Sequence, residues 1–401
     1  MKVSGLDVHK DTVFCAIYDG KKYGEVKEYQ TFSENIRTMG NDLLQAGVRK
    51  VAIESTGIYW IPVWNILEEM GFGLMLVNPY LIKQMPGRKS DVKDAQWIAK
   101  LLHKGMLRGS LVPDKTTRQL RTYSRRYVKM QGMINSAIQD IERTLELCNI
   151  RITSLVSQNN SVSVRRVVEK IIGGEDSTEE LACCIHARII NAKGDLVRRS
   201  LEGHIEEHHR ISLSLAYDQL QLYMEQSAKL EELMGQLCET HYKNELELLM
   251  TIPGIARQAA MQIIAETGGD MKAFENSGKL TGWTGLRPRN DESAGKYKST
   301  ATTNGNKYLR RIMVQSAWAA TRKKGSFYKN KFEQLCVRKS RKKALIAIAR
   351  KLLTVVWHVL EEKRPFNPLY LPVYDPRKLQ LKMNYHRKEI EKLEQLGYAA
   401  S

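Results

Sequence analysis

Apolar and polar residues alternate with a period of two along much of the first 80 residues, which is typical of β-strands. The alternation predicts five strands, at 2–10, 12–18, 22–32, 51–54 and 72–77. Apolar residues at helical spacing predict three helices, at 33–47, 59–70 and 91–103. The resulting order β-β-β-α-β-α-β-α predicts an α/β domain over residues 1–113, with a mixed sheet and helices on its faces.

The pattern changes to long helices from about residue 115. Apolar residues repeat at heptad spacing in one run from Tyr127 to Cys148 and in a second run from Leu220 to Leu237. Two such helices joined by an intervening segment predict an antiparallel coiled-coil arm over 114–248. We interpret this arm as an oligomerisation element, with a simple spacer as the alternative. The segment 151–210 between the runs is polar, and we expect short helical pieces there.

The pattern of residues 249–364 predicts a mainly α domain. The dipeptide Pro253-Gly254 stands between two helical runs and resembles the turn of a helix-hairpin-helix element, whose backbone amides meet a phosphate. Any tight helix connection can also use Pro-Gly. The domain then continues with a glycine-rich basic loop at 282–305 and helices at 307–321 and from 338 toward 362. We expect residues 365–401 to be a linker and a charged helical tail.

Composition limits the class of partner. The 401 residues include 63 Lys and Arg against 44 Asp and Glu, and the formal net charge of +19 attracts polyanions such as nucleic acid. No apolar run approaches the roughly 20 residues of a membrane-spanning helix, and charged residues interrupt any signal peptide. The six cysteines form no C-x-x-C pair, which argues against a zinc ribbon or a disulfide scaffold. We therefore expect a nucleic-acid-binding protein of the reducing cytoplasm, without membrane contact.

Four acidic residues stand where the predicted topology brings segments together. Asp7 lies on the first strand, Glu54 ends the fourth strand, and Asp91 and Asp94 share a face in the first turn of a helix. Hard divalent cations take carboxylate oxygens and polarise phosphate oxygens, so this set predicts a Mg²⁺ or Mn²⁺ site like that of the ribonuclease-H-like (RuvC-like) fold. Each acid also has a plainer interpretation. Asp91 and Asp94 can complement the helix dipole, Glu54 can cap a turn, and Asp7 can pair with Lys10.

A second candidate chemistry lies in the basic loop. Ser293 is surrounded there by Arg287, Arg289 and Lys296, cations that can orient a phosphodiester and stabilise the charge that develops during attack. No His or Asp at a recognisable spacing marks Ser293 as a hydrolase serine, so the pattern alone favours an ordinary loop serine.

Three histidines have partial metal spacing at 204, 208 and 209. They lack the H-E-x-x-H order, and the polar face of a helix is the simpler interpretation.

Six short strings, taken in order, resemble the DEDD transposases of the insertion sequence 110 family. They are LDVHK at 6–10, ESTGIYW at 54–60, KSDVKDA at 89–95, TIPG at 251–254, GLRPR at 285–289 and GNKYLR at 305–310. The resemblance implies a DNA recombinase of the bacterial, nucleoid-associated cytoplasm, with a RuvC-like domain, a coiled coil and a C-terminal domain that carries a nucleophilic serine. It also implies a structured non-coding guide RNA, the bridge RNA, that pairs with target and donor DNA. Assembly as a dimer or tetramer is implied as well, with the acidic site of one subunit meeting the serine of another.

The resemblance assigns roles to individual residues. By position, Asp7, Glu54, Asp91 and Asp94 would hold the metal, and Ser293 would form a covalent link to a DNA 5′ phosphate. Ser299 is a second candidate for the nucleophile, because Ala294 rather than glycine follows Ser293. The nucleic-acid contacts would come from a set of basic and turn residues, namely Arg287, Arg289, Lys296, Gly254, Arg310 and Arg311.

Two other functions remain open from the residues alone. A metal-dependent, structure-specific nuclease such as a junction resolvase would use the four acids and need no serine. A nucleic-acid-binding protein without enzymatic activity would use the acids only structurally.

Overall fold

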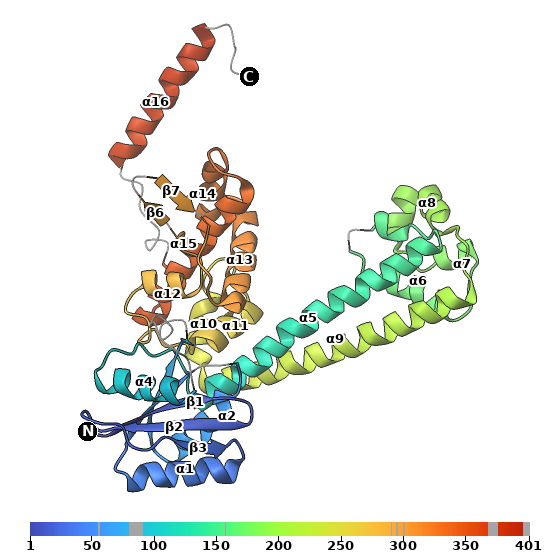
Figure 1. Ribbon diagram of the computed structural model, residues 1–401. Coiled ribbons are helices and arrows are strands. Elements are labelled where there is room, and N and C mark those ends of the chain that lie inside the picture. Colours follow the sequence, from blue (N-terminus) through green and yellow to red (C-terminus); the bar gives the residue numbers. More distant parts are fainter. Residues whose placement is uncertain are drawn as a thin grey trace. The chain divides into compact units, whose positions relative to one another are not determined.

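The structure is a computed structural model that describes residues 1–54, 57–79, 91–156, 158–289, 291–293, 296–299, 301–367 and 376–395 (Figure 1). For 291–293, 296–299, 376–379 and 381–382 it describes the backbone without the side chains. The chain forms two compact units, Met1–Pro113 and Asp114–Ser401. Across the described residues, we find no helix with the length and apolar character that crossing a membrane requires.

The first unit is built on a five-stranded sheet with the strand order β3-β2-β1-β4-β5. Its strands are β1 (Val3–Val8), β2 (Thr12–Tyr18), β3 (Lys27–Gln30), β4 (Lys50–Glu54) and β5 (Gly73–Val77). The pairs β1–β2 and β2–β3 are antiparallel, whereas β1–β4 and β4–β5 are parallel. This mixed sheet with helices between its later strands is the ribonuclease-H-like fold, as predicted. β3 is shorter than the predicted strand 22–32, because only an isolated bridge from Tyr18 to Tyr23 precedes it.

Helices cover both faces of this sheet. On one face, Leu6 and Val8 of β1 pack with the apolar sides of α1 (Ser33–Gln45) and α2 (Trp60–Glu69). On the other face lies α4 (Asp91–His103), whose Ile98 packs with Ala52 and Val77. All six residues of β1 are buried, which is typical of a central strand covered on both sides.

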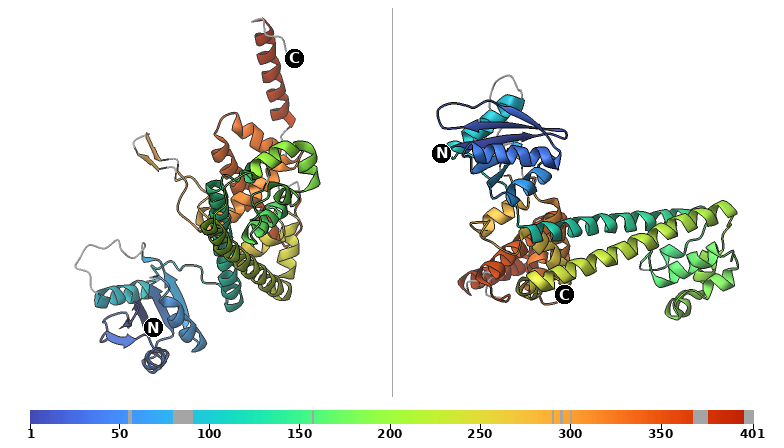
Figure 2. Two further views of the ribbon diagram at one scale, coloured as in Figure 1. Left: turned by 90° about the vertical axis from the view of Figure 1, so that its right-hand side faces the viewer. Right: turned by 90° about the horizontal axis from the view of Figure 1, so that it is seen from below.

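Two long antiparallel helices form the arm of the second unit. They are α5 (Lys115–Leu147) and α9 (Glu207–His241), and they run side by side in Figure 1 and in the right view of Figure 2. Met130, Ala137 and Ile141 are buried on the α5 side, and Leu220 and Met234 on the α9 side. The antiparallel helix pair that the heptads predicted is therefore present.

The segment between the arm helices folds into a small helical insert. It contains η1 (Ile152–Ser154), α6 (Val162–Ile172), α7 (Thr178–Ala182) and α8 (Ala187–Leu201). Its apolar residues join those of the arm tip in one core, in which Val164 and Val167 lie with Ile141 and Leu213. The insert is consequently part of the arm's own packing.

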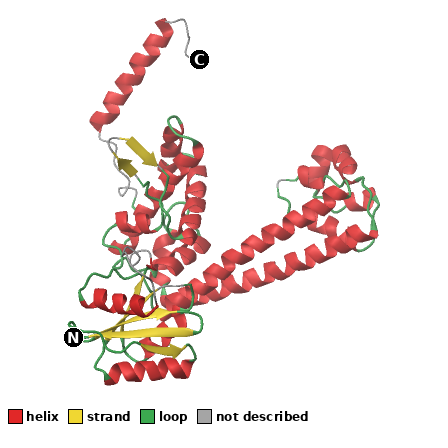
Figure 3. Cartoon of the chain, viewed as in Figure 1, coloured by secondary structure: helices red, strands yellow, loops and turns green. Residues whose placement is uncertain are grey.

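The remainder of the second unit is mainly α-helical (Figure 3). Its helices are α10 (Lys243–Met250), α11 (Arg257–Thr267), α12 (Ser277–Trp283), α13 (Lys307–Arg322), α14 (Phe327–Cys336), α15 (Arg341–Glu362) and α16 (Pro376–Gln395). Every residue of α11 from Ala259 to Thr267 is buried, as expected for a helix in the centre of a bundle. The basic stretch 338–343, predicted as one helix, instead spans the break between α14 and α15. Most of the predicted linker at 365–376 lies outside the described residues.

Candidate functional site

Asp7 and Glu54 are held on neighbouring parallel strands. The register pairs Leu6 of β1 with Ile53 of β4, so the next residue on each strand is an acid. Asp7 is 4% exposed and Glu54 is 9% exposed. Alternation along β1 turns Leu6 and Val8 toward α1 and α2, so Asp7 lies on the face that α4 covers.

Helix α4 brings two further acids to this face. It crosses β1 closely because Gly5 has no side chain, and a Cβ built on Gly5 would lie 2.4 Å from both the Ala95 oxygen and the Ala99 nitrogen. The first turn of α4 carries Asp91 and Asp94. The positive end of the helix dipole stabilises both carboxylates, and α4 brings them near Asp7.

His9 completes the cluster and was not predicted as a site residue. Its Nε2 atom lies 3.4 Å from Asp7 Oδ2 and 3.6 Å from Asp91 Oδ1. The possible ligand atoms of Asp7, His9 and Asp91 all lie within 4.8 Å of one another. The signal that could have found His9 is its position two residues after Asp7, since period-2 alternation places both side chains on one face.

The electrostatics of the cluster are those of carboxylates held together. Burial is the main cause that raises the pKa of Asp7 to about 6; His9 acts in the opposite direction, and Glu54, Asp91 and Asp94 raise it further. The donor set is also chemically right for a hard cation, because carboxylate oxygens from a strand and a helix converge. A divalent ion at this point would favour the ionised form of Asp7 and relieve the repulsion between the acids.

The predicted basic loop is in fact a β-hairpin. Arg289 donates to the Ala301 carbonyl and Thr303 to the Arg287 carbonyl, and the ladder continues into β6 (Asp291–Ser293) and β7 (Lys296–Ser299). Ser293 pairs with Lys296 at the described end of the hairpin, whereas Ser299 pairs with Asp291 farther back. Ser293 therefore lies on the tip side of Ser299.

The hairpin has a narrow base. Gly285 adopts a φ of +75°, and a Cβ on Gly305 would lie 2.4 Å from the Gly285 nitrogen. Beyond this crossing, the side chains of Arg287 and Arg289 are exposed at alternate positions. Alternation places them on one side of the extended segment, and their contact with a phosphodiester stays a prediction.

A buried carboxylate fixes the base of the hairpin to the arm, and sequence reasoning missed it. Glu266 of α11 is 1% exposed and accepts two hydrogen bonds of 2.9 Å from Arg125 of α5. It also accepts a bond of 2.6 Å from Asn306, whose own side chain caps α13. The Arg125 guanidinium lies 4.6 Å from the centre of the Tyr308 ring. No local pattern could have found a pair 141 residues apart.

The other predicted nucleic-acid contacts lie on or near α13. Gly254 has a φ of +88°, and a Cβ there would lie 2.4 Å from the Ser316 oxygen, so close packing on α13 explains this glycine. Arg310 donates a hydrogen bond of 2.7 Å to Thr302 of the hairpin. Arg311 is exposed and lines a cavity of about 380 Å³ that also includes Gly254.

The three histidines at the start of α9 (Glu207–His241) lie around Glu206, and the possible ligand atoms of Glu206, His208 and His209 are within 4.8 Å of one another. The His204 and His208 rings lie 3.0 Å and 3.1 Å from the Glu206 carboxylate, and Glu206 and His209 form a capping box at the start of α9. This arrangement satisfies the first N–H groups of the helix. The capping box agrees with the interpretation that these histidines lie on the polar face of a helix.

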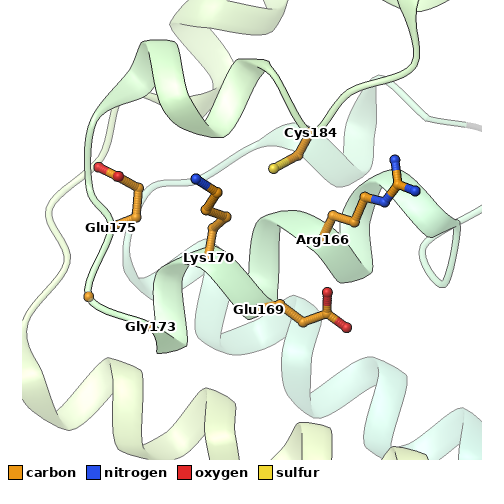
Figure 4. Close-up of a pocket in the computed structure, with 7 residues that line it drawn as sticks. Arg166, Glu169, Lys170, Gly173, Glu175 and Cys184 are labelled. Atoms are coloured by element: carbon orange, nitrogen blue, oxygen red, sulfur yellow. The ribbon is translucent and has the colours of Figure 1, made fainter.

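A second cavity of about 630 Å³ lies in the insert (Figure 4). Lys170 and Cys184 point into the same space from different segments, with Arg166 and Glu175 at its edges. Lys170 pairs with Glu180 at 3.2 Å. The cavity is thus bordered by an ordinary surface ion pair, and nothing in it continues the acidic cluster.

Two family models match the chain. One, described as the transposase IS116/IS110/IS902 family, matches residues 246–332, and the other, described as a transposase, matches residues 4–150. Together they cover more than half of the 401 residues, and they include the acidic cluster and the hairpin.

Individual proteins are similar as well. The pilin gene-inverting protein of Moraxella bovis is 26% identical over 155 residues, which are 37% of this chain and 48% of that protein, so the match spans about half of the relative. The transposase for insertion sequence element IS1111A of Coxiella burnetii is 22% identical over 381 residues, 91% of each chain. Among solved structures, T. thermophilus RuvC in complex with a Holliday junction substrate has a TM-score of 0.22 and 14% identity, over 27% of this chain and 99% of that one. On the two family models, this chain belongs to the IS110 family of transposases.

Proposed function

We propose that this protein is an RNA-guided DNA transposase, which cuts and rejoins the DNA of an insertion element. The observation that carries the proposal is that the possible ligand atoms of Asp7, His9 and Asp91 lie within 4.8 Å of one another, with Glu54 next to Asp7 in the strand register and Asp94 in the same first turn as Asp91. Clustered carboxylates repel one another unless a cation binds among them, and a net charge of +19 favours a polyanion as the substrate.

The four acids would hold Mg²⁺ or Mn²⁺. When bound, the ion would polarise the scissile phosphate and offset its negative charge. The residues themselves position the reaction, because β1 and β4 fix Asp7 and Glu54 while α4 fixes Asp91 and Asp94. His9, between Asp7 and Asp91, is placed to orient both carboxylates.

The hairpin would supply the nucleophile. The Ser293 oxygen would attack the phosphorus of a DNA strand, and the bond from phosphorus to the 3′ oxygen would break. The 3′ oxygen would leave with a proton, and the serine would stay joined to the 5′ phosphate. Attack by the 3′ hydroxyl of another strand would reverse these bond changes and rejoin the DNA. Support comes from the place of Ser293 near the hairpin tip and from the exposed Arg287 and Arg289 behind it.

The partners would be double-stranded target and donor DNA, a structured guide RNA and further copies of this chain. The acidic cluster of one subunit would act together with the serine hairpin of another in a dimer or tetramer. The charge of +19 supports contact with nucleic acid over a large surface, and such a protein would associate with the bacterial nucleoid.

A metal-dependent nuclease that resolves DNA structures is the second candidate. The observation that favours it is that the acidic cluster is formed within the first unit alone. Such an enzyme would use water in place of Ser293 as the nucleophile.

The decisive experiment is a search for a covalent protein–DNA adduct. Labelled element-end DNA would be incubated with the protein, the RNA transcribed from the element's non-coding end, and Mg²⁺, then separated on a denaturing gel. The transposase proposal expects an adduct that Ser293→Ala and Asp7→Asn both abolish and that Ser299→Ala leaves in place. Cleavage that survives Ser293→Ala but is lost with Asp7→Asn would establish the nuclease instead. Nucleic-acid binding without any metal-dependent cleavage would contradict both.

A further inference from the structure

A cavity of about 380 Å³ lies beside the Pro253-Gly254 turn. Amide and hydroxyl side chains from three helices line it, including Gln131 of α5, Gln258 of α11 and Ser316 of α13. Its floor is buried, with Gln262 8% and Ser316 3% exposed, while Asn135 and Arg311 at its edge are exposed. The cavity is therefore open to solvent at one side and polar at its base.

Two of these groups are buried without partners. Both polar atoms of the Gln258 amide and the Ser316 hydroxyl lack a hydrogen-bond partner among the described residues. Burying an unpaired polar group costs roughly 1–3 kcal/mol, so unpaired groups that line one cavity point to a ligand that completes their hydrogen bonds. The ligand must offer an acceptor and a donor side by side to satisfy the amide, as the edge of a nucleobase does.

The cavity also has a place for an anion. Helix α11 begins beside it, and its N-cap residue Ala256 makes no side-chain capping bond. The first N–H groups of a helix have no partner within the helix and carry partial positive charge, which suits a phosphate. Arg311 lies on the same cavity and adds a full positive charge. A base-recognising amide and a phosphate-recognising helix end thus share one space.

We propose that this cavity binds one unpaired nucleotide of a nucleic-acid strand, with its phosphate at the start of α11 beside Arg311 and its base against Gln258 and Ser316. The volume is within the roughly 300–1,000 Å³ of ordinary ligand sites and suits a single nucleotide rather than a duplex. Tyr127 lines the same cavity and offers an aromatic surface on which a base can stack. A base held there is unpaired, so the nucleotide comes from a single-stranded or locally opened region.

The inference rests on the proposed function only in taking nucleic acid as the partner. The acidic cluster and the serine hairpin play no part in it. Binding would be measured by calorimetry on the full-length protein in a buffer with a metal chelator, so that the acidic cluster contributes nothing. The probes would be the four deoxynucleoside and four ribonucleoside monophosphates, the matching nucleosides, and inorganic phosphate. The deoxy and ribo series distinguish DNA from RNA as the source.

We expect at least one monophosphate to bind more tightly than both its nucleoside and inorganic phosphate. Gln258→Leu should weaken this binding by roughly tenfold, which lies within the range of a good bidentate contact to a base. Ser316→Ala should weaken it by roughly fivefold. The matched control is Gln236→Leu on α9, an exposed glutamine outside the cavity that bonds to Glu232; it should leave binding unchanged.

Thermal unfolding without ligand gives a second measurement. Removal of an unpaired buried hydroxyl should not lower the melting temperature, so Ser316→Ala should be as stable as the unchanged protein or more stable. The proposal would be overturned in favour of a phosphate site alone if inorganic phosphate and the monophosphates bind equally well and neither Gln258→Leu nor Ser316→Ala changes that binding. Absence of binding by every probe would overturn it in favour of a water-filled cavity. A protein that binds the nucleotide but cuts no DNA would contradict only the proposed function.

Discussion

Asp7 is an acid that the fold destabilises in its ionised form. Its pKa is raised from 3.8 to about 6, chiefly by burial and also by the neighbouring acids. Between these two values the unfolded chain loses its proton before the folded chain does, so the free energy of unfolding falls as pH rises from about 4 to about 6. Above pH 6 the penalty stays constant, at roughly 1–3 kcal/mol for a shift of this size.

Replacement of Asp7 by Asn should therefore stabilise the metal-free protein. We expect Asp7→Asn to raise the free energy of unfolding at pH 7.5 by roughly 1–3 kcal/mol, because the ionised carboxylate is gone, while cleavage is lost. Urea denaturation at pH 4.5 and pH 7.5, in the presence of a chelator, would measure the difference. At pH 4.5 the gain should be smaller.

Asp42 provides the matched control in the same unit. Hydrogen bonds from Tyr29 and Lys27 lower the pKa of Asp42, so its ionised form is favoured in the folded protein. Asp42→Asn should lower the stability at pH 7.5. If Asp7→Asn loses as much stability as Asp42→Asn, the ionised Asp7 carboxylate is stabilised by its neighbours, as an ordinary surface acid is. That result would contradict the prediction.

For single residues, the sequence predicts which acids are candidates for the metal site better than it predicts which side chains bond to one another. Asp7, Glu54, Asp91 and Asp94 stand at element ends or in first turns, where local pattern and topology are enough to bring them together. Glu266 and Arg125 belong to different helices and meet only in the packed molecule. The Gln258 amide and the Ser316 hydroxyl, which have no hydrogen-bond partner among the described residues, could not be found from the sequence either, because a missing partner is a property of the folded interior.

The contact between β1 and α4 depends on one missing side chain. Gly5→Ala would place a Cβ 2.4 Å from the backbone of Ala95 and Ala99, and backbone cannot rotate away as a side chain can. We expect α4 to shift and carry Asp91 away from Asp7, with roughly 100-fold loss of metal-dependent cleavage. Mn²⁺ titration would show weaker binding, while circular dichroism would show the same helical content.

Gly73→Ala on β5 is the matched change in the same sheet. A Cβ there would meet the Arg49 oxygen at 3.5 Å, an ordinary contact. Gly73→Ala should therefore leave the affinity for Mn²⁺ unchanged. If Gly5→Ala also leaves metal binding as it is, the close approach of α4 does not position the acids.

The Glu266 carboxylate joins α5, α11 and the start of α13. Glu266→Ala would take a buried acceptor from the partly exposed Arg125 guanidinium and from the Asn306 amide, and losing hydrogen bonds to a charged group typically costs roughly 1.5–3 kcal/mol. Urea denaturation would measure the loss. The control Glu247→Ala removes an exposed acid of α10 and should cost little. A small effect of Glu266→Ala would mean that the arm and the hairpin base are held together by apolar packing alone.

The hairpin shows what pattern alone does not predict about elements. Its glycines and basic residues are typical of a loop, and the sequence contains no alternation of apolar residues there that would indicate a strand. The crossing of Gly285 and Gly305 instead brings the two segments into register through backbone hydrogen bonds. The arm helices were predictable, because heptad spacing records the burial of one face along their whole length.

For the whole molecule, the excess of 19 positive charges favours contacts with many phosphates, and the number of those contacts sets the salt dependence of nucleic-acid binding. If 6–10 phosphates are contacted, the association constant for duplex DNA should fall by roughly 10³–10⁵-fold between 50 mM and 200 mM salt. Fluorescence anisotropy with a random-sequence duplex would measure it, without metal. Affinity that hardly changes with salt would contradict a binding surface dominated by phosphate contacts.

The shared core of the arm tip and the insert limits how the arm can be shortened. Ile141 and Leu145 of α5, with Leu213 and Leu220 of α9, are buried against the insert. Deleting 151–206 alone would uncover these side chains, and we expect the shortened protein to aggregate, as gel filtration would show. Deleting 133–224 with a short connecting loop should avoid this, because the helices would then end beside the hydrogen bond from Gln131 to Ser227. The insert would thus cover the apolar far end of the two arm helices, much as capping repeats cover the ends of solenoid proteins.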